Sequence, residues 1–248
     1  MLKNLIKGSF VILCIFSAVF SFNQAEANLG RKQNKVGVVY WHGDLNQKKI
    51  ALTFDDGPNE PYTSQILDIL KTYNIKATFF LIGKNVETYP EVAKRMAKEG
   101  HCIGNHTYNH PELMLKLRIQ IERQIKKAEE IIFKVTGIRP YLFRPPYGLD
   151  NPWVFVEAEK MGYLIIKWSV SGGNGGKEIS YDKILNKVLN KVENGSIILL
   201  HDGNRLIKGA DRSQLVRALP LIIEMLENKG YQFVTIPELL GFEFENNG

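Results

Sequence analysis

The chain has 248 residues, of which 44% are hydrophobic, and its 32 Lys and Arg outnumber its 26 Asp and Glu, giving a formal charge of +6. This length and apolar content predict one domain with a full hydrophobic core. The Lys residues are scattered over expected helical faces and no basic run lies beside stacked aromatics, which argues against a nucleic-acid-binding protein.

The first 27 residues are typical of a secretory signal peptide. Lys3 and Lys7 precede an apolar stretch over 10–20, and Ala25-Glu26-Ala27 matches an A-x-A cleavage site. We therefore expect a mature chain that begins at Asn28 and is secreted or associated with the cell wall. An uncleaved membrane anchor is the alternative, although the apolar stretch is shorter than the roughly 20 residues that span a bilayer.

Cleavage would leave Cys102 as the last cysteine, so no intrachain disulfide is expected. It would also remove two Lys and one Glu, lowering the formal charge from +6 to +5. A mildly basic exported protein suits an anionic cell surface. We expect a monomer with no stable membrane span after cleavage.

The mature chain then alternates apolar runs with helical patterns. Residues 28–48 form a linker with a lead-in strand over 36–41, residues 49–240 form the domain, and 241–248 form a tail. Strands are predicted over 49–54, 77–82, 101–104, 141–143, 163–170, 197–200 and 231–235. Helices are predicted over 62–73, 90–99, 111–137, 152–162, 180–193 and 213–228, with a short helical turn at the end. Such alternation indicates parallel strands joined by crossover helices, in an open doubly wound sheet or a closed barrel.

Polar residues follow several of these strands, where both architectures build active sites. Asp55 and Asp56 stand where an apolar run meets a Gly-Pro turn, so one carboxylate could hold a metal while the other handles a proton. A solvated Asp-Gly turn is the alternative. Four of the five histidines are also expected near these ends, namely His101, His106, His110 and His201.

His106 and His110 have the H-x3-H spacing of a metal-binding pair, and Pro111 places them on a turn ahead of a helix. Two His and one Asp would leave coordination positions open, as in a catalytic zinc site. Arg144 begins a rigid Pro-Pro turn and is well shaped to hold a carboxylate, unless it is a surface residue. His201 directly follows a buried strand, where a capped core histidine is the alternative.

The ordered motifs TFDDGP, HTYNH, RPPYG, WSV and LLHD closely resemble those of the polysaccharide deacetylases, carbohydrate esterase family 4, also called the NodB homology domain. The resemblance covers roughly residues 49–240. It implies a deformed (β/α)7 barrel.

Position by position, the resemblance implies that Asp55 is the catalytic base and His201 the acid, with Arg144 orienting Asp55. The resemblance also implies a metal site, in which Asp56, His106 and His110 would bind one divalent metal, usually zinc. The backbone N–H of Tyr147 would help hold the oxyanion. The pocket for the acetyl group would be lined by Trp168 and Leu199.

The fourth motif departs from the family pattern. Ser171 and Asn174 stand where W-S-x-D-x-x-D-W would place Asp, and the first of these Asp normally pairs with the catalytic His. The Gly-rich segment around them should also make the loop more mobile.

We predict a secreted, metal-dependent hydrolase that removes N-acetyl groups from an amino-sugar polymer, with peptidoglycan N-acetylglucosamine as the preferred substrate. Chitin oligomers, an exopolysaccharide, N-acetylmuramic acid or O-acetyl xylan are alternatives. A non-catalytic wall-binding protein that has lost turnover through the fourth motif is the rival class.

Overall fold

The structure is a computed structural model that describes residues 39–148, 152–173, 175, 179–205 and 207–242. The predicted signal peptide (1–27), the first part of the predicted linker (28–38) and most of the predicted tail lie outside these residues. The fold belongs to the compact unit that starts at Gly37. In the described part of the chain, no helix is long and apolar enough to cross a membrane.

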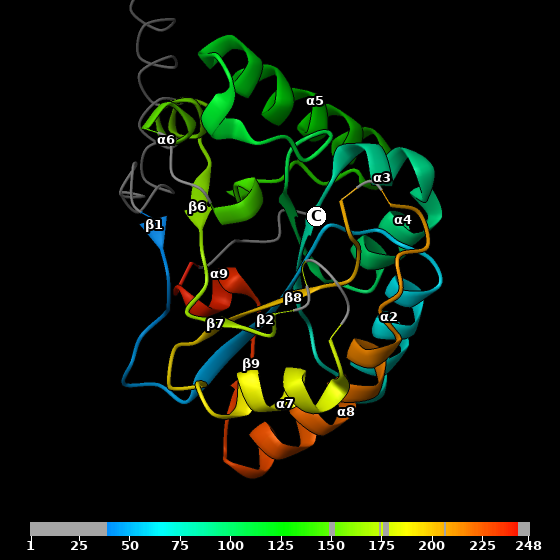
Figure 1. The fold of residues 1–248 in the computed structure, drawn as a ribbon. Helices are drawn as coiled ribbons and strands as arrows, with labels where there is room; N and C mark the ends of the chain where they lie inside the picture. The colour runs from blue at the N-terminus through cyan, green and yellow to red at the C-terminus, as the bar shows by residue number, and fades with distance from the viewer. Residues whose placement is uncertain (1–38, 149–151, 174, 176–178, 206, 243–248) are drawn as a thin grey trace, which may run out of the picture. The chain divides into compact units, whose positions relative to one another are not determined.

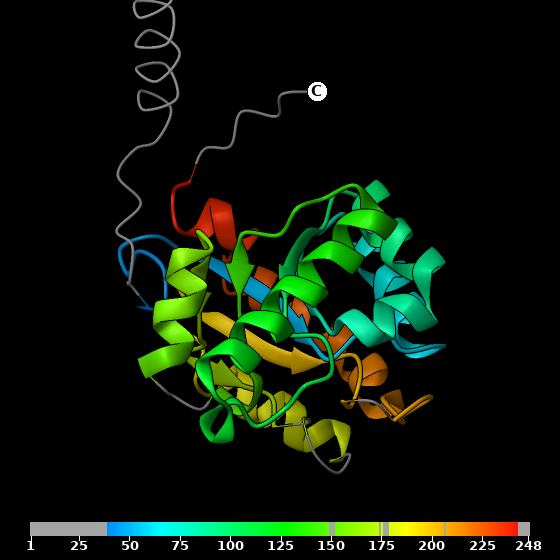
Figure 2. The same cartoon turned by 90° about the horizontal axis from the view of Figure 1, so that it is seen from above.

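One parallel sheet organises the described residues (Figures 1 and 2). Its strands are β1 (Val39–Tyr40), β2 (Lys49–Asp55), β3 (Thr78–Leu81), β4 (Cys102–Asn105), β5 (Leu142–Phe143), β6 (Leu164–Ile166), β7 (Val170–Ser171), β8 (Ile197–His201) and β9 (Gln232–Phe233). They follow the order β1-β6-β5-β4-β3-β2-β8-β7, and β9 pairs with the start of β2. The predicted family fold is confirmed as a curled sheet covered by helices.

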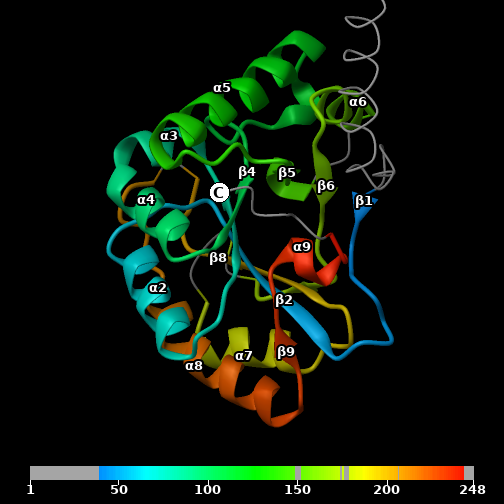
Figure 3. The same ribbon diagram turned by 180° about the vertical axis from the view of Figure 1, so that it is seen from behind.

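Helices connect the strands. They are α2 (Tyr62–Thr72), α3 (Gly83–Thr88), α4 (Pro90–Lys98), α5 (Arg118–Thr136), α6 (Pro152–Lys160), α7 (Tyr181–Leu189), α8 (Ser213–Asn228) and α9 (Ile236–Leu239), with 3-10 turns η1 (Leu113–Leu115) and η2 (Pro146–Gly148). The longer helices surround the convex side of the curled sheet, whereas α9 lies on its concave side (Figures 1 and 3).

Two predicted elements differ from the structure. The expected strand over 163–170 is two strands, because β6 pairs with β5 at one side of the sheet while β7 pairs with β8 at the other. The segment 167–169 between them therefore links the two sides of the curl. The helix expected from Pro111 begins at Arg118, because a loop and η1 come first, and α3 was not predicted.

Alternation along the strands gives the sheet two different faces. Ile50, Leu52 and Phe54 of β2 pack into the cluster under the outer helices, whereas Ala51 packs on the inner face. The inner face is apolar at the amino ends of the strands, where α9 covers it with Leu239. Period-2 alternation keeps the later odd residues of β2 on this same face, and those are polar. The active-site candidates therefore lie at the carboxyl end of the inner face.

Candidate active site

Strand β2 lies between β3 and β8, which places its last residue among several strand ends. Asp55 is in register with Phe80 of β3 on one side and with His201 of β8 on the other. Parallel strands in register point matched residues to the same face, so the Asp55 and His201 side chains share the inner face. The two predicted proton-transfer residues are thus neighbours across the sheet.

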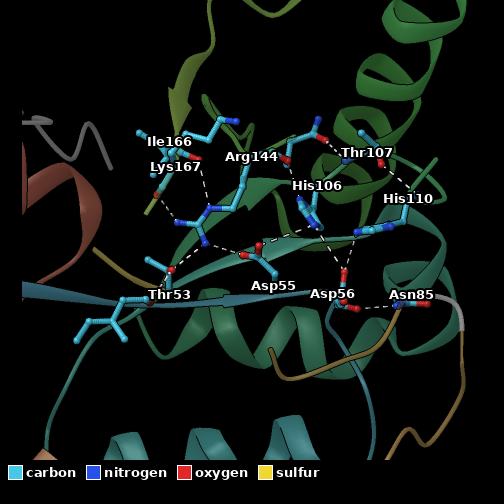
Figure 4. Close-up of polar contacts among 12 residues, drawn as sticks. Thr53, Asp55, Asp56, Asn85, His106, Thr107, His110, Arg144, Ile166 and Lys167 are labelled. Carbon is cyan, nitrogen blue, oxygen red and sulfur yellow. Dashed lines mark hydrogen bonds and ion pairs between the residues drawn. The ribbon is translucent and has the colours of Figure 1, made fainter. Parts of the chain in front are cut away.

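The Arg144 side chain holds the Asp55 carboxylate. Its Nη1 donates to Asp55 Oδ1 at 2.7 Å and to the Thr53 hydroxyl at 2.8 Å, while Nε and Nη2 donate to the carbonyls of Ile166 and Lys167 (Figure 4). The guanidinium is fully buried. A buried Arg that donates from all three guanidinium nitrogens fixes the carboxylate in one orientation. The prediction that Arg144 holds a carboxylate agrees with this geometry.

Asp56 turns away from Asp55 because its backbone has a left-handed conformation, with φ of 76°. Two glycines permit the tight packing around this turn. A Cβ on Gly57 would lie 2.0 Å from an oxygen of Asp202, and one on Gly203 would lie 2.4 Å from the carbonyl oxygen of Asp56. The loops after β2 and β8 can therefore approach closely, and Asn85 of α3 ties them by donating to the Asp56 carbonyl at 2.7 Å.

The two histidines come from the loop after β4. Asn105 accepts the Thr107 N–H and Thr107 in turn accepts the His110 N–H, at 2.8 and 3.1 Å, which shapes the loop. His106 Nδ1 lies 2.6 Å from the Arg144 carbonyl oxygen. Because a carbonyl only accepts, Nδ1 carries the proton and the Nε2 lone pair of His106 is free to bind a metal.

Asp56, His106 and His110 converge on one point. Asp56 Oδ1 lies 3.6 Å from His106 Nε2 and 3.3 Å from His110 Nε2, and all three residues are buried (Figure 4). Among the described residues this oxygen has no hydrogen-bond partner. A buried, unpartnered carboxylate oxygen facing two imidazole nitrogens fits a divalent cation, and two nitrogens with one oxygen is a donor set that zinc accepts.

Burial controls the protonation of these groups. It lowers the pKa of His106, lowers the pKa of His110 to about 4, and raises the pKa of Asp56. The imidazoles are therefore neutral near pH 7, as metal ligands must be. The Asp56 carboxylate is costly to keep charged here without a cation.

His201 lies beneath the fourth-motif loop. A Cβ on Gly175 would lie 2.7 Å from His201 Nε2, so this glycine packs against the ring. Burial lowers the pKa of His201, and the Asp55 carboxylate opposes that shift. The Ser171 hydroxyl accepts the Gly173 N–H at 3.2 Å, and Asn174 lies outside the described residues.

Asp202 does not replace the missing Asp of the fourth motif. It is buried on the other side of β8, where it accepts the Thr63 hydroxyl at 2.7 Å. Adjacent residues along a strand direction point to opposite faces, so Asp202 faces away from the side that carries His201.

The predicted substrate contacts lie around this centre. The Tyr147 ring packs edge-on against His110 with 4.6 Å between centroids. The Trp168 ring lies 5.8 Å from the Arg144 guanidinium, and Leu199 is in register with Thr53 on the inner face. Tyr147 therefore lies beside a predicted metal ligand, whereas Trp168 and Leu199 lie beside Arg144 and Thr53, the residues that support Asp55.

The prediction that His101 lies near the site is wrong. It precedes β4 and so lies at the amino end of the sheet, where its Nδ1 accepts the Ala77 N–H at 3.2 Å. Conversely, Thr53 and Asn85 support the site and were missed. Thr53 stood inside the TFDDGP motif and could have been found from its inward register, whereas Asn85 lies on the unpredicted α3.

Comparison with known proteins agrees with this geometry. The family model for polysaccharide deacetylase matches residues 42–166. A peptidoglycan-N-acetylglucosamine deacetylase of Bacillus cereus is 44% identical over 79% of this chain and 70% of its own length. The peptidoglycan-N-acetylmuramic acid deacetylase PdaC of Bacillus subtilis is 42% identical over 79% of this chain but 39% of its own length.

The solved structures give the same result. The crystal structure of the Bc1960 peptidoglycan N-acetylglucosamine deacetylase superposes with a TM-score of 0.78 at 41% identity, covering 84% of this chain and 95% of that one. The fold, the ordered motifs and these matches agree. The chain belongs to the polysaccharide deacetylase family, whose members are hydrolases acting on N-acetyl groups.

Proposed function

We propose that this protein is a secreted, zinc-dependent deacetylase that hydrolyses the N-acetyl groups of peptidoglycan N-acetylglucosamine. The observation that carries the proposal is a buried carboxylate, Asp55, held by Arg144 directly beside the ligand set of Asp56, His106 and His110. A separate base and metal site at one strand end suit the hydrolysis of an amide.

In this proposal the chain's own residues move the protons. Asp55 removes a proton from the attacking water, and the Tyr147 N–H donates to the developing oxyanion. Zinc, when bound by Asp56, His106 and His110, would act as a Lewis acid toward the acetamide carbonyl.

His201 gives a proton to the leaving amine. It can do so only after its pKa has risen from the value that burial sets, and the Asp55 carboxylate acts in that direction.

The names of the relatives support the choice of polymer, and the apolar segment over 10–20 supports export. The decisive experiment measures acetate release from purified peptidoglycan, glycol-chitin and acetylated xylan, with and without a chelator. We expect release from peptidoglycan that the chelator abolishes and zinc restores. Release from xylan alone would contradict the proposed substrate, and none from any polymer would favour a non-catalytic wall-binding protein.

Export has its own test. Sequencing the amino terminus of the protein recovered from a bacterial culture should show a chain that begins at Asn28. A protein that retains residues 1–27 would contradict the cleaved form.

A further inference from the structure

Arg205 is fixed at the mouth of the candidate site by its backbone. Its N–H donates to the Asp56 carboxylate, and its carbonyl accepts Asn85 Nδ2 at 2.7 Å. The same Asn85 amide donates to the Asp56 carbonyl, as Figure 4 shows. The backbone of Arg205 has a left-handed φ of 47°. The loop after β8 is therefore anchored to a predicted metal ligand, and the Arg205 side chain starts from a defined point.

The Arg205 side chain extends over Tyr147. Its guanidinium carbon lies 4.7 Å from the centroid of that ring, and the same ring packs on His110. Arg205 is exposed to solvent although its guanidinium lies over this ring. Its charge reaches the site, where burial lowers the pKa of His110 and Arg205 adds to that shift, and where burial raises the pKa of Tyr147 and Arg205 opposes that rise.

None of the proposed chemical steps uses the Arg205 guanidinium. Asp55 is held by Arg144, and the predicted ligands are one carboxylate and two imidazoles. A stacked guanidinium with a free edge has the geometry that pairs with a carboxylate. The exposed Glu112 acts on Tyr147 with the opposite sign to Arg205, so side chains of both charges lie near this ring. A neutral polymer would gain nothing from these charges.

We infer that Arg205 determines specificity by binding a carboxylate carried on or beside the sugar that is deacetylated. The inference rests on the proposed function and narrows its substrate to acidic amino-sugar polymers. In a glycan that contains muramic acid, this carboxylate has two sources: the free lactyl group of a bare sugar, or the peptide attached to it. Neutral chitin oligomers offer neither.

The test compares three tetrasaccharides of equal length: chitotetraose, a bare N-acetylglucosamine–N-acetylmuramic acid tetrasaccharide, and the same compound with its peptides. For Arg205→Gln we expect kcat/KM on at least one acidic substrate to fall about tenfold, mainly through KM, because a charge-assisted hydrogen bond is lost. On chitotetraose the change should stay within about twofold. Lys208→Gln removes the same charge from an exposed position on the same loop and should change kcat/KM on all three substrates within about twofold.

A loss confined to the bare tetrasaccharide identifies the lactyl carboxylate, and a loss confined to the peptide-bearing one identifies the peptide. An equal loss on all three substrates, or no loss on any, would overturn the inference. Metal content is measured for each variant, because the Arg205 backbone contacts Asp56.

Binding separates this inference from the proposed function. The dissociation constants of the same three compounds are measured with Asp55→Asn and with Asp55→Asn carrying Arg205→Gln. If the wild-type enzyme releases no acetate from any of them, the proposed function fails, yet a preference for acidic ligands that disappears with Arg205 would still support the inference. Equal affinities for all three in both proteins would refute it.

Discussion

The two ends of the sheet's inner face bury different kinds of side chain, although the same strands form both ends. At the amino end, Ala51, Leu142 and Ile197 pack under α9 in an apolar cluster. At the carboxyl end, Asp55 and Arg144 are equally buried but polar. Apolar burial stabilises the fold directly, whereas buried charges at best offset their own desolvation. The amino end of the inner face therefore stabilises the fold, whereas the carboxyl end lowers stability and carries the residues of the candidate site.

Mutating one residue at each end gives the clearest test of this difference between the two ends. Asp55→Asn should lower kcat about 10³-fold while the fold and metal content remain, because the base is lost and the ligands are kept. Ile197→Ala should lower the free energy of unfolding by about 2–4 kcal/mol and leave kcat/KM of the folded protein within about twofold. Acetate release, metal analysis and urea unfolding give these values. Full activity in a metal-loaded Asp55→Asn would refute the role of Asp55.

A second prediction concerns His101, a histidine at the amino end. Burial lowers the pKa of His101 to about 4. Between pH 6.5 and 4 its imidazole is therefore neutral in the folded protein but protonated in the unfolded chain. The free energy of unfolding should therefore fall by up to about 3 kcal/mol as the pH drops from 6.5 to 4. His101→Asn should flatten that part of the stability curve without changing activity at pH 7. The exposed His42→Asn is the matched control, and identical curves for all three proteins would contradict the prediction.

The third prediction tests whether the carboxyl end lowers stability. Without metal, Asp56 is a buried carboxylate whose pKa is raised by desolvation. In the presence of a chelator, Asp56→Asn should therefore raise the free energy of unfolding by about 1–2 kcal/mol. Added zinc should stabilise the wild-type protein and not the variant. Urea unfolding with and without zinc measures both effects, and a less stable metal-free variant would count against the comparison.

The smallest expected effect concerns Ser171, which is in register with Leu199, two residues before His201. Ser171→Asp should raise the pKa of His201, because a carboxylate favours the protonated imidazole, and should move the alkaline limb of kcat/KM up by about one pH unit. Ser171→Asn changes the shape in the same way without the charge. Superimposable pH profiles for the wild type and both variants would mean that position 171 does not act on His201.

Sequence patterns predicted what depends on local rules. Period-2 runs and glycine stops located most strands and helices, and Asp55, His106 and Arg144 stood out at strand ends. The split between β6 and β7 was not predictable, because residues 163–170 contain no Gly or Pro to mark a break and the pairing partners decide where the run divides.

His101 was misassigned for a related reason. It stands at a strand boundary, and spacing alone does not tell which end of the sheet that boundary occupies. Arg205 was not identified because it lies in a loop without periodicity, and only tertiary contacts bring it to Tyr147.

The position of β2 between β3 and β8 also affects how the molecule folds. Thr53 of β2 donates to the Ile198 carbonyl, a contact between residues 145 positions apart, so half of the central pairing closes a very long loop. Closures of that length slow folding. A growing chain that has reached β6 already carries Asp55, Asp56, His106, His110 and Arg144, but one edge of β2 is still unpaired. Until β8 arrives, that edge is open to pairing with other chains, so His201 arrives on the strand that protects the protein from aggregation.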